Sequence, residues 1–274
     1  TYVGDEIDFT TMPLVYDAPA DTLAVMHHDI RSLDENGGKI YAMTKYGVSV
    51  LDSEQNAQSH HWLPEGIVLN DGFLARSNGL PYAAVLGTTA GFAVAPLLAD
   101  GALGSMPTWS WSFAEKVNAV APLAGEDTNL HVIGLGDGGE GLVIEIDGNA
   151  NIITTSEIGA GLKAGLGEAN ASVSAIQHGL VGGSTFHLFV GTDRGLLVVD
   201  TPTARDEATG EWRFFFTRET NPIPTNVDEL RSLPLGVNDN PADVRTLVLD
   251  GPSANNAQAL WFGTPSGVHK LDLI

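Results

Sequence analysis

Hydrophobic residues along this 274-residue chain gather in pairs of short runs, and a turn containing glycine joins the two runs of each pair. The clearest pair closes the sequence, where residues 259–274 read ALWFGTPSGVHKLDLI. Runs rich in Val, Ile, Leu, Phe and Tyr favour β-strands, and glycine readily adopts the positive φ angle that a tight connection requires. Each pair of runs therefore predicts a β-hairpin.

The paired pattern occurs five times, and four of the five copies keep Thr-x-x-Gly at the turn. The turn glycines lie 44 to 72 residues apart by subtraction of their numbers, near the roughly 40 to 50 residues of one propeller blade. These glycines are Gly47, Gly91, Gly141, Gly195 and Gly267.

Two shorter runs flank each hairpin. An apolar alternation such as Val244-Arg-Thr-Leu247 precedes it, and an aromatic or β-branched run such as Trp109-Ser-Trp-Ser-Phe113 follows it. Four strands per repeat are typical of an all-β propeller, so we expect a single domain over residues 1–274 with five four-stranded blades. The expected blades cover residues 21–66, 67–115, 116–170, 171–226 and 227–274, with an insertion over 221–242.

The fifth hairpin is followed by no run that could form its outer strand. The apolar run Ile7–Val15, near the other end of the sequence, is the candidate for that place, so we expect an N-terminal strand over residues 1–20 to close the ring. The same strand exchange between two chains would give self-association through the terminal strands.

The best-preserved copies, Phe186–Asp200 and Leu260–Asp272, share the form apolar-Trp/Phe-x-Gly-Thr-x-x-Gly-apolar and end in Leu-Asp or Val-Asp. This form resembles the propeller repeats in the sensor ectodomains of two-component regulators. The resemblance covers only part of each unit, and its residues are mostly structural. It implies a sensory or ligand-binding propeller and assigns no catalytic residue. The second copy departs from it at Ala95, and the third has the longer loop Gly134–Gly141.

Composition limits the partners. The chain has 34 acidic and 13 basic residues and a formal charge of −21, which disfavours nucleic acid and anionic membrane surfaces and attracts cations. The absence of cysteine excludes disulfides and thiolate metal sites. No apolar run reaches the roughly 18 to 20 residues of a membrane span. Because the chain begins at Thr1, we expect a secreted or cell-surface protein of a bacterial, disulfide-free type.

Two loops resemble ligand-binding motifs. Gly134–Gly139 fits G-x-G-x-x-G, but a strand pattern follows where a dinucleotide site requires a helix, so a turn is expected. Asp147–Asn151 offers oxygen ligands at alternate positions, yet Ile152 stands where a calcium loop requires glycine, which favours an Asp-Gly hairpin turn. No G-x-S-x-G or H-E-x-x-H motif occurs. Of the two His-His pairs, His27-His28 precedes an inner strand, and His60-His61 is expected at the surface of an outer strand.

In a propeller, the loop before each inner strand and the turn of each central hairpin lie on one rim, so these loops predict a shared binding site at the mouth of the central channel. The candidate ligand-binding residues are His27, His28, Asp29, Asp71, Glu115, Asn170, Asp193, Arg194 and Asp243. The candidate metal ligands are Asp71, Asp137 and Asp243. Lys45, Tyr46, Lys116 and Glu140 belong to the same loops. An acid-rich mouth suits Ca²⁺, a cationic or sugar ligand, or a basic protein segment.

The expected function is therefore a non-catalytic, secreted or surface propeller that binds a ligand or other protein chains, including copies of itself, and requires no cofactor. The alternative is a metal-dependent hydrolase or lyase at the mouth of the channel. In that alternative His27 or His28 acts as base or ligand, and Asp71, Asn170 and Asp243 hold a divalent ion.

Overall fold

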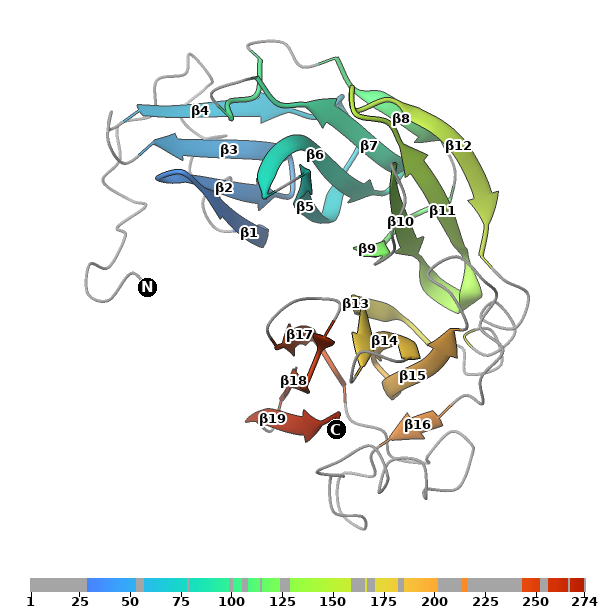
Figure 1. Ribbon diagram of the computed structural model, residues 1–274. Helices are drawn as coiled ribbons and strands as arrows, with labels where there is room; N and C mark the ends of the chain where they lie inside the picture. The colour runs from blue at the N-terminus through green and yellow to red at the C-terminus, as the bar shows by residue number, and fades with distance from the viewer. Residues whose placement is uncertain are drawn as a thin grey trace.

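The computed structural model describes residues 29–52, 57–77, 79–98, 101–104, 108–113, 115–123, 129–158, 166, 171–181, 185–201, 213–215, 243–251, 256–265 and 267–273. Its strands form five antiparallel sheets that follow one another around a common centre (Figure 1). The chain is a five-bladed β-propeller. The predicted all-β fold is confirmed.

In each sheet the strands run in chain order from the centre outward (Figure 1). The first sheet contains β1 (Ile30–Asn36), β2 (Lys39–Thr44), β3 (Gly47–Asp52) and β4 (Ala57–Trp62). The second contains β5 (Leu69–Ser77), β6 (Leu80–Thr88), β7 (Gly91–Pro96) and β8 (Ser110–Phe113). The third contains β9 (Ala119–Leu123), β10 (Leu130–Leu135), β11 (Gly141–Ile146) and β12 (Ile152–Glu157).

The fourth sheet contains β13 (Val173–Val181), β14 (Thr185–Thr192), β15 (Gly195–Thr201) and β16 (Arg213–Phe215). The fifth contains β17 (Thr246–Asp250), β18 (Ala259–Thr264) and β19 (Gly267–Asp272). Within the described residues the fifth sheet thus has three strands and the other four sheets have four each. The expected closing strand over residues 7–15 and the expected insertion over 221–242 lie outside the described residues.

The Thr-x-x-Gly motif forms the turn between the two central strands of a sheet. The threonine hydroxyl donates a hydrogen bond to the carbonyl oxygen of the glycine, at 3.1 Å from Thr44 to Gly47 and 2.9 Å from Thr88 to Gly91. Thr192 and Thr264 make the same bond to their glycines. The glycine φ angles in these turns are positive, from 98° to 151°, a conformation that costs glycine far less than other residues. The Thr-x-x-Gly motif therefore serves turn geometry.

Backbone hydrogen bonds connect the turns of the first four sheets to the sheet that follows each of them. The amide of Leu69 donates to Lys45 O, that of Val117 to Thr88 O and that of Val244 to Thr192 O, each at 2.9 Å. The junction between the third and fourth sheets departs from this pattern, because a 3₁₀ turn, Asp137–Gly139, replaces Thr-x-x-Gly there. At that junction the amide of Gly138 donates to Ala171 O at 3.2 Å.

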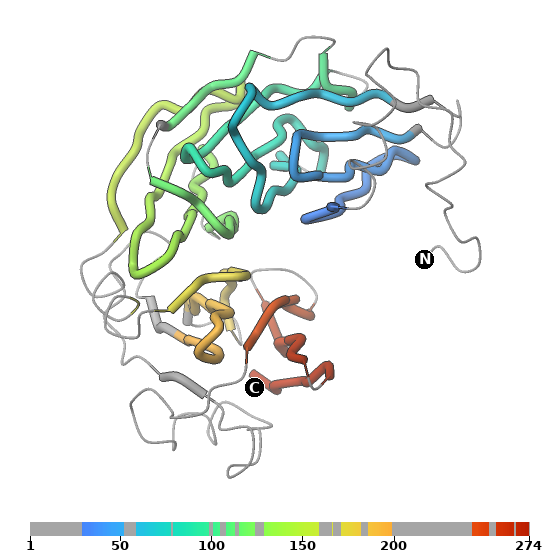
Figure 2. Tube along the Cα trace, turned by 180° about the vertical axis from the view of Figure 1, so that it is seen from behind, coloured from blue at the N-terminus to red at the C-terminus, as the bar shows by residue number. Residues whose placement is uncertain are grey.

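The hydrophobic core consists of four clusters, and each cluster lies between two consecutive sheets. Tyr41 packs with Leu74 between the first and second sheets, and Phe189 packs with Leu260 between the fourth and fifth. The two remaining clusters occupy the second and third junctions. Since alternate residues of a strand point to opposite faces, each interior sheet contributes to two clusters. Figures 1 and 2 show the first and fifth sheets at the two ends of the resulting arc.

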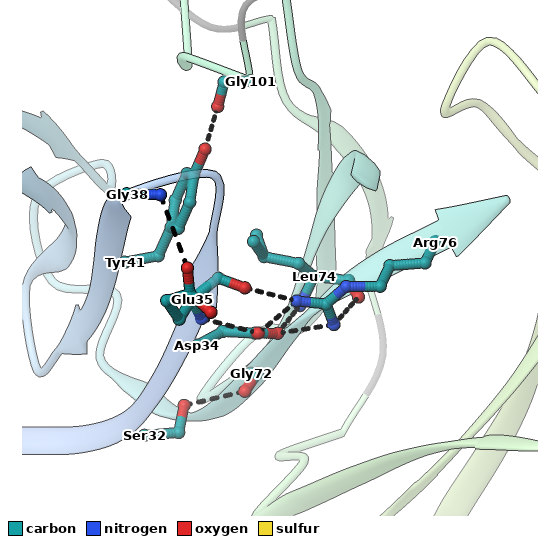
Figure 3. A network of polar contacts seen from close by, with 9 residues as sticks. All are labelled: Ser32, Asp34, Glu35, Gly38, Tyr41, Gly72, Leu74, Arg76 and Gly101. Atoms are coloured by element: carbon teal, nitrogen blue, oxygen red, sulfur yellow. Dashed lines mark hydrogen bonds and ion pairs between the residues drawn. The ribbon is translucent and has the colours of Figure 1, made fainter. Parts of the chain in front are cut away.

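Polar contacts add a second link between the first two sheets (Figure 3). The Asp34 carboxylate receives hydrogen bonds from the Arg76 guanidinium, at 2.5 and 3.3 Å, and from the Leu74 amide at 2.9 Å. Ser32 Oγ donates to Gly72 O at 2.7 Å, and the buried Tyr41 hydroxyl donates to Gly101 O. The contacts of Ser32 and Asp34 fix β1 against β5, and that of Tyr41 joins β2 to the loop after β7.

Candidate functional site

The loop before each inner strand meets the turn of its own central hairpin. The amide of Lys45 donates to Asp29 O at 3.0 Å, and the amide of Asp193 donates to Ser172 O at 3.1 Å. In the fifth sheet the amide of Arg245, just before β17, donates to Gly263 O, near the end of β18, at 2.9 Å. Within each of these sheets the two loops therefore share one end, which we call the rim. His27, His28 and Asn170 lie outside the described residues.

Asp71 links the second sheet to the third. Its carboxylate oxygens accept hydrogen bonds from the amide of Gly72 at 2.8 Å and from the amide of Val120, on β9, at 3.0 Å. Burial raises the pKa of Asp71 to about 6, although both amide hydrogen bonds act in the opposite direction. Both carboxylate oxygens are thus engaged in joining two sheets.

Asp137 links the third sheet to the fourth. It accepts hydrogen bonds from Lys116 Nζ at 3.0 Å, from Asn118 Nδ2 at 2.6 Å and from Ser172 Oγ at 2.7 Å. Burial alone raises the pKa of Asp137, but the hydrogen bonds of Ser172, Lys116 and Asn118, together with the charge of Lys116, lower it overall. Asp137 is therefore a carboxylate at neutral pH, surrounded by donors of its own chain.

Three further rim acids, Asp29, Asp193 and Asp243, also have partners. Asp29 pairs with Arg31 at 2.9 Å, and Asp243 pairs with Arg245 at 2.7 Å. Asp193 Oδ1 accepts a hydrogen bond from the Ser172 amide at 2.8 Å. Arginine and lysine thus neutralise much of the acidity that the sequence places on the described part of the rim.

The structure does not bring the candidate metal ligands Asp71, Asp137 and Asp243 into one cluster. Among the described residues, no group of three or more His, Cys, Asp or Glu side chains could hold a metal ion. Calcium binding stays a prediction, because His27, His28 and Asn170 fall outside those residues. The described residues add no observation in favour of the hydrolase or lyase alternative.

Both motif-like loops are turns, as predicted. The loop Gly134–Gly139 runs from the end of β10 through the 3₁₀ turn and is followed by β11. Asp147 Oδ1 accepts hydrogen bonds from the amides of Asn149 and Asn151 at 2.9 and 2.8 Å, which closes the turn between β11 and β12. These bonds, with that from Asn151 foremost, lower the pKa of Asp147.

The expectation that His60 and His61 lie at the surface is wrong. Both side chains are buried: His60 is 9% and His61 is 5% exposed. His60 Nδ1 lies 2.7 Å from Ser49 Oγ, and its ring meets Trp62 edge-on at 4.4 Å. Burial lowers the pKa of His61. These histidines are packing residues.

Another feature that sequence reasoning missed is an exposed apolar surface on the fifth sheet. We call Val248, Trp261, Val268 and Lys270 the fifth-sheet face. Leu260, Phe262 and Leu271 pack toward the fourth sheet, so the alternating, cross-paired residues of the fifth-sheet face point the other way. Val248 is 60%, Trp261 39% and Val268 73% exposed.

Charged groups border this apolar centre. Trp261 Nε1 donates a hydrogen bond to Asp250 Oδ2 at 3.3 Å. Lys270 Nζ lies 5.9 Å from the centre of the indole ring and pairs with Asp272 at 2.7 Å. Tryptophan is one of the residues enriched at the binding hot spots of protein interfaces.

No family model and no curated protein sequence matches the chain. In structure it is similar to the extracellular domain of the one component system BT4673 from B. thetaiotaomicron, with a TM-score of 0.49 and 13% identity over 88% of this chain and 27% of that chain. The same domain is also described as part of a hybrid two component system. An ectodomain of the kind that the repeat motif indicated is thus among the similar structures.

Two further propellers are similar to the chain. The calcium-binding protein regucalcin from Agrobacterium tumefaciens has a TM-score of 0.49 and 12% identity, over 84% of this chain and 66% of that chain. The Neurospora crassa Pan2 WD40 domain has a TM-score of 0.48 and 10% identity, over 89% and 78%. The similarity concerns the fold alone. In the part of the chain that the structure describes, no helix has the length and hydropathy to cross a bilayer.

Proposed function

We propose that the chain is a non-catalytic propeller, secreted or displayed on a cell surface, whose function is to bind other protein chains. The observation that supports this most is the fifth-sheet face, where Trp261 and two valines are exposed on one side of a sheet. Contiguous exposed apolar surface on a soluble protein marks an interaction site more often than a catalytic one.

The state of the rim supports the same proposal. A catalytic carboxylate needs access to substrate, whereas both oxygens of Asp71 accept amide hydrogen bonds from the chain itself. Asp137 has three side-chain donors. Asp71 and Asp137 therefore act as joints between sheets.

The energetics of the fifth-sheet face suit a specific contact. Covering Val248 and Val268, which are 60% and 73% exposed, would contribute about 1 to 2 kcal/mol each. Truncation of a tryptophan anchor in a protein interface typically costs about 2 to 4 kcal/mol of binding energy. Together these side chains are sufficient for a moderate-affinity contact.

The test compares partner capture by the wild-type chain and by the double variant Trp261→Ser/Val268→Ser. Both chains are expressed in the source cells and cross-linked in place, and the captured proteins are quantified. We expect wild type to capture at least one protein chain, itself or another, that the double variant loses.

Leu80→Ser is the matched control, because Leu80 is 70% exposed and lies on the second sheet, at the start of β6. The control should capture the same chains as wild type, and all three proteins should melt at the same temperature. Equal capture by wild type and the double variant would contradict the proposal.

A further inference from the structure

In the first, second and fourth sheets, the residues equivalent to those of the fifth-sheet face are covered by a neighbouring sheet. Three residues before the turn threonine stand Tyr41, Val85 and Phe189, which are at most 1% exposed. Directly after the turn glycine stand Val48, Phe92 and Leu196, which are fully buried. Each of these side chains packs against the sheet that follows. Trp261 and Val268 occupy the same two positions in the fifth sheet and are exposed.

The first sheet is poorly suited to cover this face. On the side of the first sheet opposite Tyr41, the side chains of Ala42, Ser49 and Leu51 are already buried, and Leu33 is the large exposed hydrophobic residue there. Figures 1 and 2 both place the first and fifth sheets at opposite ends of the arc.

Lys270 strengthens this argument. Three residues after the turn glycine, the first, second and fourth sheets carry the buried valines Val50, Val94 and Val198, whereas the fifth carries Lys270. A buried ammonium group is costly unless an acid pairs with it. Asp272 of the same chain pairs with Lys270 at 2.7 Å. The surface that covers the fifth-sheet face must therefore keep this ion pair or exchange it for an equivalent one, and it must present apolar area near Trp261.

We infer that this surface is the fifth-sheet face of a second copy of the chain, packed about a two-fold axis. The inference rests on the proposed function and names the partner. Cross-strand pairing places Val248, Trp261 and Lys270 in one row and Asp250, Ala259 and Asp272 in the next row of the same face. A two-fold axis across the strands, between these rows, sets Lys270 of each copy opposite Asp272 of the other.

The arrangement of charges on this face favours the two-fold orientation. Two chains of net charge −21 repel each other as a whole, so they associate best where each surface carries a base beside acids and is self-complementary. The fifth-sheet face and its margin carry one base, Lys270, and the two acids Asp250 and Asp272. Because the fifth-sheet face consists of few side chains, we expect a small interface and a weak dimer, with a Kd on the order of 10 to 100 µM.

The test is a charge swap followed by sedimentation velocity over a concentration series from about 5 to about 500 µM, which brackets that Kd. In Lys270→Asp the contact juxtaposes acids only, and in Asp272→Lys it juxtaposes bases only. Each variant alone should dimerise at least about tenfold more weakly than wild type. An equimolar mixture of the two should recover dimers, because each acid again faces a base.

Trp261→Ser/Val268→Ser should also lose the dimer, and Leu80→Ser should keep it. These substitutions replace exposed residues, so circular dichroism and melting temperature should match wild type. Three outcomes would overturn the inference: a wild-type monomer at every concentration, variants that dimerise like wild type, or a mixture that does not recover dimers. A monomeric chain that captures another protein through Trp261 would overturn this inference alone and leave the proposed function standing.

Discussion

The carboxylate of Asp71, on β5, accepts a 3.0 Å hydrogen bond from the amide of Val120, on β9. This contact is one of the links between the second and third blades, beside the 2.8 Å hydrogen bond from Asn70 Nδ2 to Val117 O. Replacing Asp71 with Ala leaves the amides of Val120 and Gly72 without this acceptor, and we expect a loss of about 1 to 3 kcal/mol in the free energy of unfolding. Urea denaturation measures the change. Glu115→Gln, at an exposed rim position, is the control and should change stability by less than about 0.5 kcal/mol.

Two buried groups, Asp71 and His178, should change the folding stability in opposite directions as pH rises. Burial raises the pKa of Asp71 to about 6, so the protonated carboxyl is favoured in the folded state. The stability that Asp71 contributes is therefore present at low pH and is lost as pH rises through about 6. Asp71→Asn abolishes this titration. The stability of wild type relative to Asp71→Asn should therefore fall between pH 4 and pH 7, and a constant difference across that range would contradict the assignment.

His178 titrates in the opposite sense. Burial, and secondarily the charge of His187, lowers the pKa of His178 to about 4. The neutral ring favours the folded state, so stability is fully present above the ordinary pKa of 6.5 and is lost as pH falls from there toward 4. Between pH 7 and pH 4, wild type should lose up to about 3 kcal/mol more than His178→Gln. Parallel pH profiles for the two proteins would contradict a lowered pKa for His178 in the folded state.

The Asp34–Arg76 contact should contribute more to the free energy of unfolding than an exposed ion pair on the rim. Asp34 also accepts the Leu74 amide, and Arg76 also donates to Glu35 O at 2.9 Å (Figure 3). We expect Arg76→Ala to cost about 1 to 2 kcal/mol. Arg245→Ala removes a more exposed pair and should cost at most about 0.5 kcal/mol. Equal losses would show that the network between β1 and β5 adds nothing.

Two turn glycines provide a matched test of packing. A Cβ atom at Gly47 would lie 2.1 Å from the carbonyl oxygen of His61, while one at Gly267 would meet nothing within 4 Å. Both residues have positive φ, 151° and 140°. Gly267→Ala should cost about 1 kcal/mol from backbone strain alone, and Gly47→Ala should cost at least about 2 kcal/mol more. Similar melting temperatures for the two variants would refute this difference.

The turns and strands were predictable because their causes are local. The Thr192 hydroxyl and the positive φ of Gly195 act within four residues, and the alternation of β14 and β15 follows directly. The burial of His60 and His61 was not predictable, since it depends on the tertiary contacts of β4. Sequence spacing carries no information about those contacts.

The candidate site was predictable in part. Topology places Asp71 and Asp137 near the rim, but their partners Val120 and Ser172 come from the next sheet. No spacing rule reveals that pairing. The fifth-sheet face had a readable signal, because Lys270 stands where three other repeats have valine. A position-by-position comparison of the repeats reveals this exposed face.

The most direct measurement is hydroxyl-radical footprinting of Trp261 in dilute and concentrated solutions of the wild-type chain, read out by mass spectrometry. At 39% exposure, Trp261 is accessible to the reagent in the single chain. The proposed interface predicts that the oxidation rates of Trp261 and Val268 fall together as concentration rises through the Kd, while that of Leu80 stays constant. An unchanged rate at Trp261 in solutions where the chain is associated would contradict the account.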